Sequence, residues 1–150
     1  MVPAVRIQAE PFDPGAELAA LAGSGDVGGL ASFLGLCRDE GGRLAALELE
    51  HYPGMAEAEI GRVCAEAARR WPLLGLSVIH RYGRIEPGEA IVLVAAAAAH
   101  RAPAFAAAEF VMDFLKTRAP FWKREHLRDG SFGAWVEATD ADNRAAERWD

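Results

Sequence analysis

An uninterrupted apolar run, Ala90 to Ala99, is the feature that most constrains how this chain folds. It is about half as long as a membrane-spanning helix requires, so it indicates an element buried in a globular core. The run opens with Ile-Val-Leu-Val, whose β-branched side chains favour a strand, although residues 95–99 are alanines that would suit a helix equally well. Because Pro103 soon restarts the chain as a helix, we interpret Ile91 to Ala98 as a buried strand.

Local spacing predicts the other elements. Asp13-Pro14 is an N-cap followed by a proline at the first helical position, which predicts a short helix through Leu21. A long helix is predicted where apolar residues recur three and four apart (56, 60, 63, 64, 67, 71) and end at Pro72. Strands are predicted around 5–7, at the edge of a sheet, and over 27–35, 44–52 and 76–82.

A second long helix begins near Pro103 and ends before Pro120, with Phe105, Ala108, Met112 and Leu115 on one face. No repeat or linker divides the sequence, so we expect residues 1–150 to form one domain. Short antiparallel hairpins with two substantial helices indicate the α+β class.

Charge and composition narrow the function. The chain has 150 residues, of which 51% are hydrophobic and 25% charged, and this is ordinary globular composition. A net charge of −6 argues against a general nucleic-acid binder. The N-terminus lacks the charged-then-apolar layout of a secretory signal, so we expect a cytoplasmic protein without a membrane segment.

Cations nevertheless concentrate between residues 116 and 128. This stretch contains only one acidic residue, Glu125. It contains five positively charged residues: Lys116, Arg118, Lys123, Arg124 and Arg128. The stretch fits a site for a small anion and a solvated basic face equally well. Asp113, three residues before Lys116, has the spacing of an ordinary helical ion pair.

His100-Arg101 stands where the buried strand gives way to a helix N-terminus. Backbone N–H groups and the helix dipole favour an anion there, and the guanidinium of Arg101 is a forked donor suited to phosphate. A structural histidine is the alternative interpretation.

Lys116 falls in the last turn of the second long helix, and Lys123 follows the break at Pro120. Two lysines held close together would each favour the neutral amine on the other, and a neutral amine can act as a nucleophile or base. Complementing the helix dipole is the structural alternative for Lys116.

The other reactive residue types suggest no chemistry. Cys64 is expected to be buried and inert, and Cys37, in a glycine-flanked segment, to be partly exposed. His80-Arg81, at a strand end, is expected to be structural. The histidines are far apart, without an HExxH motif or paired cysteines, so no metal site is predicted.

Taken together, several segments resemble the large subunit of the molybdopterin synthase family. Their order and spacing extend over nearly the whole chain. They are FLGLCR (33–38), LELEHYPGM (47–55), RWP (70–72), VIHRYG (78–83), PGE (87–89), AHRAPAF (99–105), MDFLKTRAPFWKRE (112–125) and WVE (135–137).

The resemblance implies a hammerhead-like α+β fold with an antiparallel or mixed sheet and two main helices. It also implies a homodimer in which each subunit binds one small ubiquitin-like sulfur carrier, giving a heterotetramer. The carrier's C-terminal Gly-Gly thiocarboxylate would donate sulfur to cyclic pyranopterin monophosphate, and two transfers would form the dithiolene of molybdopterin. No metal or cofactor is implied, because the thiocarboxylate is itself the activated reagent.

The same resemblance assigns roles to single residues. Lys116 and Lys123 match the two essential lysines of the family. The residues that match its anion-binding and pocket positions are Arg38, His100, Arg101, Phe33 and Met112. Leu36 and Thr139 depart from the pattern, because relatives often carry a lysine and an arginine there, and both changes remove a phosphate contact.

Two other functional classes remain open at this stage. One is a non-catalytic scaffold that binds a ubiquitin-like partner, and the retention of Lys116 and Lys123 counts against it. The other is a phosphate-ligand or nucleic-acid binding module that uses residues 121–124, and the acidic net charge counts against that.

Overall fold

The apolar run forms an inner strand of a four-stranded sheet in the computed structural model, which describes residues 1–23, 25–136 and 140–150. The sheet has the order β1 (Ala4–Gln8), β4 (Gly75–Arg81), β6 (Ala90–Ala98), β2 (Gly29–Leu36). β1 pairs with β4 in parallel, and the other two pairings are antiparallel. The expected mixed sheet and the strand at 91–98 are therefore confirmed.

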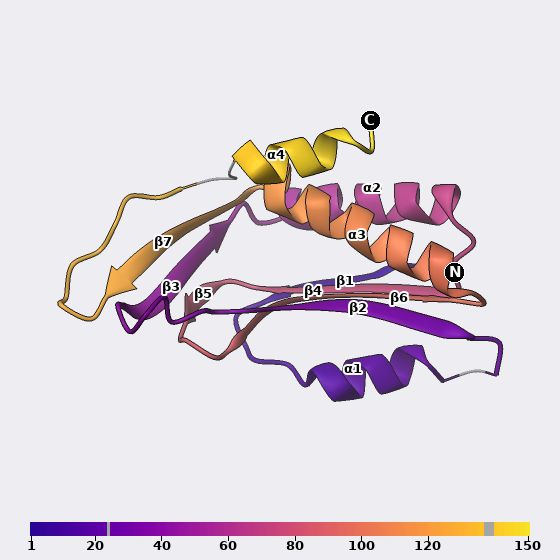
Figure 1. Cartoon of the computed structure of the whole chain (residues 1–150), viewed down its shortest axis with the longest axis horizontal. Helices are drawn as coiled ribbons and strands as arrows, with labels where there is room; N and C mark the ends of the chain where they lie inside the picture. The colour runs from indigo at the N-terminus through magenta and orange to yellow at the C-terminus, as the bar shows by residue number, and fades with distance from the viewer. Residues whose placement is uncertain (24, 137–139) are drawn as a thin grey trace.

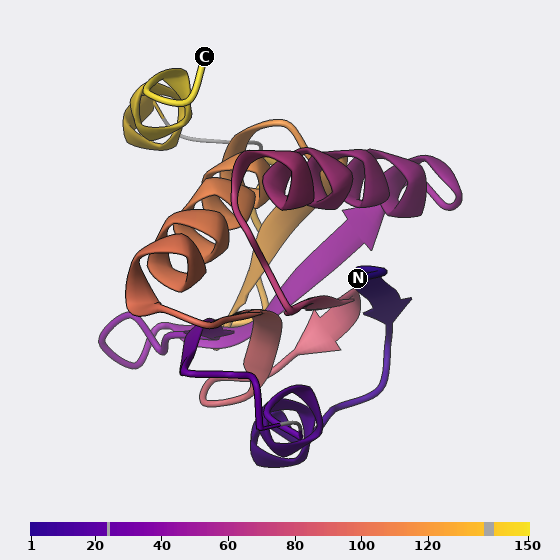
Figure 2. The ribbon, with the colours of Figure 1, turned by 90° about the vertical axis from the view of Figure 1, so that its right-hand side faces the viewer.

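Helices cover both faces of this sheet (Figures 1 and 2). α2 (Met55–Arg70) and α3 (Arg101–Thr117) pack on one face, where alternate residues of β6 from Val92 to Ala98 join the main core. α1 (Pro14–Leu21) lies on the other face, and the Asp13 side chain accepts a 3.2 Å hydrogen bond from Ala16 N at its start. This N-cap is the one that the sequence predicts.

A second sheet stands beside the first and contains β5 (Gly83–Ile85), β3 (Leu44–His51) and β7 (Phe121–Leu127) in that order, all antiparallel. Figure 1 shows β3 and β7 extending past the end of the helices. A small core of Cys37, Leu44, Leu49 and Ile85 covers one side of it. β5 and β7 are not among the elements that the sequence predicts.

The end of the chain returns to the helical layer. α4 (Asp140–Glu147) lies beside α3 (Figure 1), and Trp149 contacts Trp71 and Phe110 edge-on at centroid distances of 5.8 and 5.6 Å. Arg148 donates to Glu109 at 2.6 Å and to Asp113 at 2.8 Å. Asp113 is thus bonded to the C-terminal tail. The spacing in the sequence suggests a different partner, Lys116, for this carboxylate.

Two expectations about single residues change in the folded chain. Cys37 is 2% exposed, because it lies under the second sheet, so the partly exposed position expected for it is wrong. Phe105, which its spacing places on one helix face with Ala108, Met112 and Leu115, is 64% exposed, whereas those three residues are buried. Within the described residues, no helix is long and apolar enough to cross a membrane.

Candidate active site

Lys116 and Lys123 are the only lysines of the chain, since the other cations among its 16 lysines and arginines are all arginines. An arginine keeps its proton in proteins, whereas a lysine can lose one when its surroundings disfavour the charge. A position that needs only positive charge can be filled by either residue type. The two lysines therefore mark the positions where a titratable amine is available.

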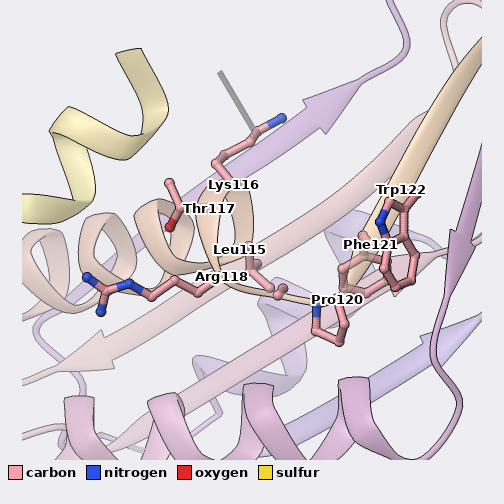
Figure 3. A pocket seen from close by; sticks show the side chains of 8 residues that line it. Leu115, Lys116, Thr117, Arg118, Pro120, Phe121 and Trp122 are labelled. Carbon is pink, nitrogen blue, oxygen red and sulfur yellow. The ribbon is translucent and has the colours of Figure 1, made fainter. Parts of the chain in front are cut away.

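Lys116 lies in the last turn of α3 and lines two hollows. The smaller hollow, about 210 Å³, is formed by the chain that leaves the helix, from Leu115 to Trp122 (Figure 3). Figure 3 shows that the side chains of Lys116 and Arg118 leave this end of the helix in different directions. Only Lys116 reaches the larger hollow as well.

The larger hollow, about 430 Å³, lies between β2 and α3 and has a largely apolar lining. Phe33, which is 45% exposed, and the buried Met112 contribute to it, as the resemblance implies. Phe105 lines it too, and its helical spacing concealed this role. The complete lining is Ala31, Ser32, Phe33, Phe105, Ala108, Glu109, Met112, Asp113 and Lys116. An apolar hollow with one amine at its rim suits a flat or extended ligand that carries one reacting group.

Lys123 projects from β7, opposite Leu49 of β3. Its backbone N donates to Val136 O at 3.1 Å and its carbonyl accepts from Val136 N at 2.8 Å, so both sides of this strand segment are held. The position of Lys123 is thus fixed by strand pairing rather than by a helix.

The two lysines are close enough to influence each other. Burial lowers the pKa of the Lys116 amine, the positive charge of Lys123 lowers it further, and the negative charge of Asp142 opposes this shift. Lys116 retains an exposed side chain, so solvent screens part of this effect. A lowered pKa increases the fraction of Lys116 that is neutral at a given pH, as proton transfer or nucleophilic attack requires.

His100 and Arg101 lie at the opposite end of α3. Arg101 is the first residue of the helix, and both side chains are exposed. Fifteen residues of helix separate Arg101 from Lys116, which corresponds to about 22 Å at the usual rise per residue. One chain therefore does not bring these two candidate anion-binding residues to its own lysine pair.

Arg38 lies at the other end of β2 from His100 and Arg101. β2 begins at Gly29, where an added Cβ would lie 3.5 Å from the Arg101 backbone, so this end of the strand is beside the start of α3. The strand ends at Leu36, and Arg38 follows two residues later. The Arg38 side chain is 86% exposed and lies 3.9 Å from Glu40. Arg43 bridges Glu40 at 3.1 Å and Glu125 at 3.8 Å, which links the Arg38 loop to the strand that carries Lys123.

The basic stretch does not form a single surface. In β7 the register pairs Arg124 with Glu48 and Lys123 with Leu49, so these two cations point to opposite faces of the sheet. Glu48 accepts from Arg124 at 3.0 Å and from His126 at 2.9 Å. Residues 121–124 thus lack the one-sided arrangement that nucleic-acid binding along this stretch requires.

An aromatic cluster lies beside the lysines, and no pattern in the sequence predicts that its rings come together. The ring of His80 stacks on Phe121 at 3.9 Å, and His51 lies 6.1 Å from Phe121 and 4.5 Å from Tyr82. We refer to these four residues as the aromatic corner. The available signal was the His-Arg pair at the end of a strand, which resembles a structural histidine in sequence.

The departures from the family pattern have different outcomes. Leu36 is 54% exposed at the end of β2, two residues before Arg38. Thr139 and Glu137 lie outside the described residues.

No group of three or more His, Cys, Asp or Glu side chains that could hold a metal ion occurs in 1–23, 25–136 and 140–150.

The fold and the candidate site define a small α+β protein with one lysine at the rim of an apolar hollow and a second lysine that influences it. Residues 7–118 match the model of the MoaE protein family. The molybdopterin synthase catalytic subunit of Mesorhizobium japonicum is 67% identical over 99% of this chain and 94% of its own length. That of Pseudomonas aeruginosa is 51% identical over 98% of this chain and 99% of its own. This chain belongs to the MoaE family.

Solved structures agree with that placement. The molybdopterin biosynthesis MoaE protein from Burkholderia ambifaria has a TM-score of 0.84 and 49% identity, covering 98% of this chain and 97% of that one. The molybdopterin synthase from Staphylococcus aureus has a TM-score of 0.78 and 29% identity, covering 87% and 95%.

Proposed function

We propose that this chain is the catalytic subunit of a molybdopterin synthase and acts as a sulfurtransferase. A small ubiquitin-like carrier presents its C-terminal Gly-Gly thiocarboxylate, and the sulfur passes to cyclic pyranopterin monophosphate. Two transfers form the dithiolene of molybdopterin. The observation that carries this proposal is the position of Lys116, which lines both hollows and lies near the only other lysine.

The roles of the lysines follow from their positions. Once the thiocarboxylate sulfur has bonded to a pterin carbon, water adds to the carbonyl carbon of the carrier, and a nearby ammonium stabilises the negative charge that develops on the carbonyl oxygen. Collapse of this intermediate breaks the carbon–sulfur bond, which leaves the sulfur on the pterin and a carboxylate on the carrier. Lys116, whose pKa is lowered, can also take up or release a proton during each transfer. Lys123 positions the substrate or serves as the second acid or base. Phe33 and Met112 line the hollow beside Lys116.

The anion-binding residues require two copies of the chain. Arg101 is about 22 Å from Lys116 along α3, farther than a pterin monophosphate can reach from one to the other. We therefore propose that the homodimer forms each site from both subunits, with Lys116, Lys123 and Arg38 from one subunit and His100 and Arg101 from its partner. The complete assembly with two carriers is a heterotetramer.

The test mixes the protein with cyclic pyranopterin monophosphate and a thiocarboxylated carrier and measures the dithiolene product. Lys116→Ala and Lys123→Ala should each lose most of the activity, while Arg62→Ala, an exposed cation paired with Glu59 on α2, should keep it. Lys116→Arg separates the two roles of Lys116, since it keeps the charge and loses the titratable amine. A wild-type protein that binds the carrier but forms no product would show that the chain is a non-catalytic scaffold.

A further inference from the structure

The His80 side chain is 6% exposed at the end of β4, and its ring lies almost parallel to that of Phe121, at 14° and 3.9 Å. Its Nδ1 is 2.8 Å from the backbone carbonyl oxygen of Arg81. Because a carbonyl only accepts hydrogen bonds, Nδ1 carries the hydrogen and the ring is held in one orientation.

The surroundings keep this ring neutral. Burial lowers the pKa of His80 to about 4, although the hydrogen bond to Arg81 works in the opposite direction. The titratable groups that face it are Lys116 of α3 and His51 of β3, and both lower the pKa of His80 further. Arg81 turns its guanidinium away, toward the carbonyl of Ala9 at 2.9 Å. His80 therefore acts at neutral pH through the shape and contacts of its ring rather than through charge.

Phe121 connects His80 to the strand that carries Lys123. It is the first residue of β7 and follows Lys116 after one short turn (Figure 3). It pairs with His51 in register, while Lys123 pairs with Leu49, so Phe121 and Lys123 project from the same face of the strand. Strand pairing holds Lys123 within the second sheet, and the stack of His80 on Phe121 connects the start of that strand to β4, beside the turn that leads from Lys116.

We propose that His80 is a positioning residue for the lysine pair: by stacking on Phe121 it sets the separation of the Lys116 and Lys123 amines. This inference rests on the proposed function, because the two lysines act together in the proposed reaction. The separation of the amines is a property of the protein alone, however, and can be measured without turnover. A failure of the proposed function would therefore leave this measurement intact.

The measurement is the pH dependence of acetylation of Lys116 by a trace of acetic anhydride, followed by peptide mass spectrometry. The chain has only two lysines, so each modified peptide is unambiguous, and the N-terminal amine is an internal reference. Lys123→Ala should raise the pKa of Lys116, because the neighbouring charge is gone. His80→Ala should raise it in the same direction, and His80→Phe, which keeps a stacked ring, should leave it near the wild-type value.

A double-mutant cycle separates positioning from burial. If His80 acts through the distance to Lys123, His80→Ala should change the Lys116 titration little in a Lys123→Ala background. An equal change in both backgrounds would overturn the proposal, because His80 would then act on Lys116 through burial alone. An unchanged Lys116 titration in folded His80→Ala would also overturn it.

Turnover supplies a second readout. His80→Ala should lower kcat by roughly tenfold while changing the KM for the pterin much less, as expected when reacting groups are misplaced. His80→Phe should retain most of the activity. If His80→Ala does not fold, as judged by Tm and circular dichroism, His80→Leu replaces it with the same expected results, since leucine fills the volume without a flat ring.

Discussion

The indole Nε1 of Trp149 donates a 2.6 Å hydrogen bond to Asp113 Oδ2, which attaches the end of the chain to the C-terminal part of α3. Arg148 bonds the same carboxylate, and Asp150 accepts two hydrogen bonds from Arg118 at 3.0 and 3.1 Å. Asp113 and Arg118 lie on either side of Lys116 in sequence. The last three residues therefore secure the helix end that carries a candidate catalytic amine.

The first prediction concerns this tail. Trp149→Ala should lower the free energy of unfolding by about 2 kcal/mol, because it removes a half-buried indole and leaves Asp113 with one partner fewer. Urea denaturation measures the change. Trp135→Ala is the matched control, since that indole is 40% exposed and should cost clearly less. A Trp149→Ala variant as stable as the wild-type protein would show that the tail contacts contribute nothing to folding.

The second prediction compares two glycines. A Cβ on Gly28 would lie 2.1 Å from the carbonyl oxygen of Ala99, whereas a Cβ on Gly61, inside α2, would meet nothing within 4 Å. Gly28→Ala should destabilise the protein by about 1–3 kcal/mol through this clash. Gly61→Ala should stabilise it by about 0.5–1 kcal/mol, because alanine is the better helix former. Thermal unfolding of the pair should give Tm shifts of opposite sign, and shifts of the same sign would contradict this explanation.

The third prediction tests whether the site is shared between subunits. Arg38→Ala and Arg101→Ala should each be inactive alone. When the two inactive proteins are mixed so that subunits exchange, half of the dimers pair one of each kind, and each such dimer regains one complete site. Random exchange should thus restore about a quarter of the wild-type activity. If all site residues came from one chain, mixing would restore none.

The fourth prediction concerns the cysteines. Cys37 and Cys64 are both buried, and burial raises the pKa of each thiol, to about 12 for Cys64. Since the thiolate is the reactive form, a chromogenic disulfide reagent at neutral pH should detect less than about 0.1 thiol per folded chain. The same reagent should detect both thiols in denaturant. Rapid reaction of one thiol in the folded protein would show that its segment opens readily.

Elements with a strong local signal were predictable. Tertiary contacts do not override the local pattern in three of them. These are the Asp13-Pro14 start of α1, the apolar stripe of α2 and the buried run of β6. β7 was missed because it is an edge strand without alternating apolar residues. On the strand face that carries Phe121, the next two side chains are those of Lys123 and Glu125, which are charged. α4 was missed because it is short and polar, and its neighbouring tail is held by contacts with α3.

The candidate site was predictable as a set of parts. The resemblance supplied the lysines, Arg38, His100 and Arg101, and the helix start at Arg101 was foreseen to within two residues. Their arrangement depends on the direction in which β2 and α3 run together, and no local pattern reports that direction. For the same reason, the contact of His80 with Phe121, 41 residues later in the chain, has no counterpart in sequence spacing.

The buried cysteines matter for the chemistry that we propose. A cysteine thiolate beside the activated carrier could attack its carbonyl carbon, which would trap the carrier as a thioester and release the sulfur as sulfide. With Cys37 held beneath the second sheet and Cys64 on the core face of α2, neither sulfur is a competing acceptor. The fold thereby keeps thiols out of the lining of both hollows, so that in the proposed reaction no cysteine competes with the pterin.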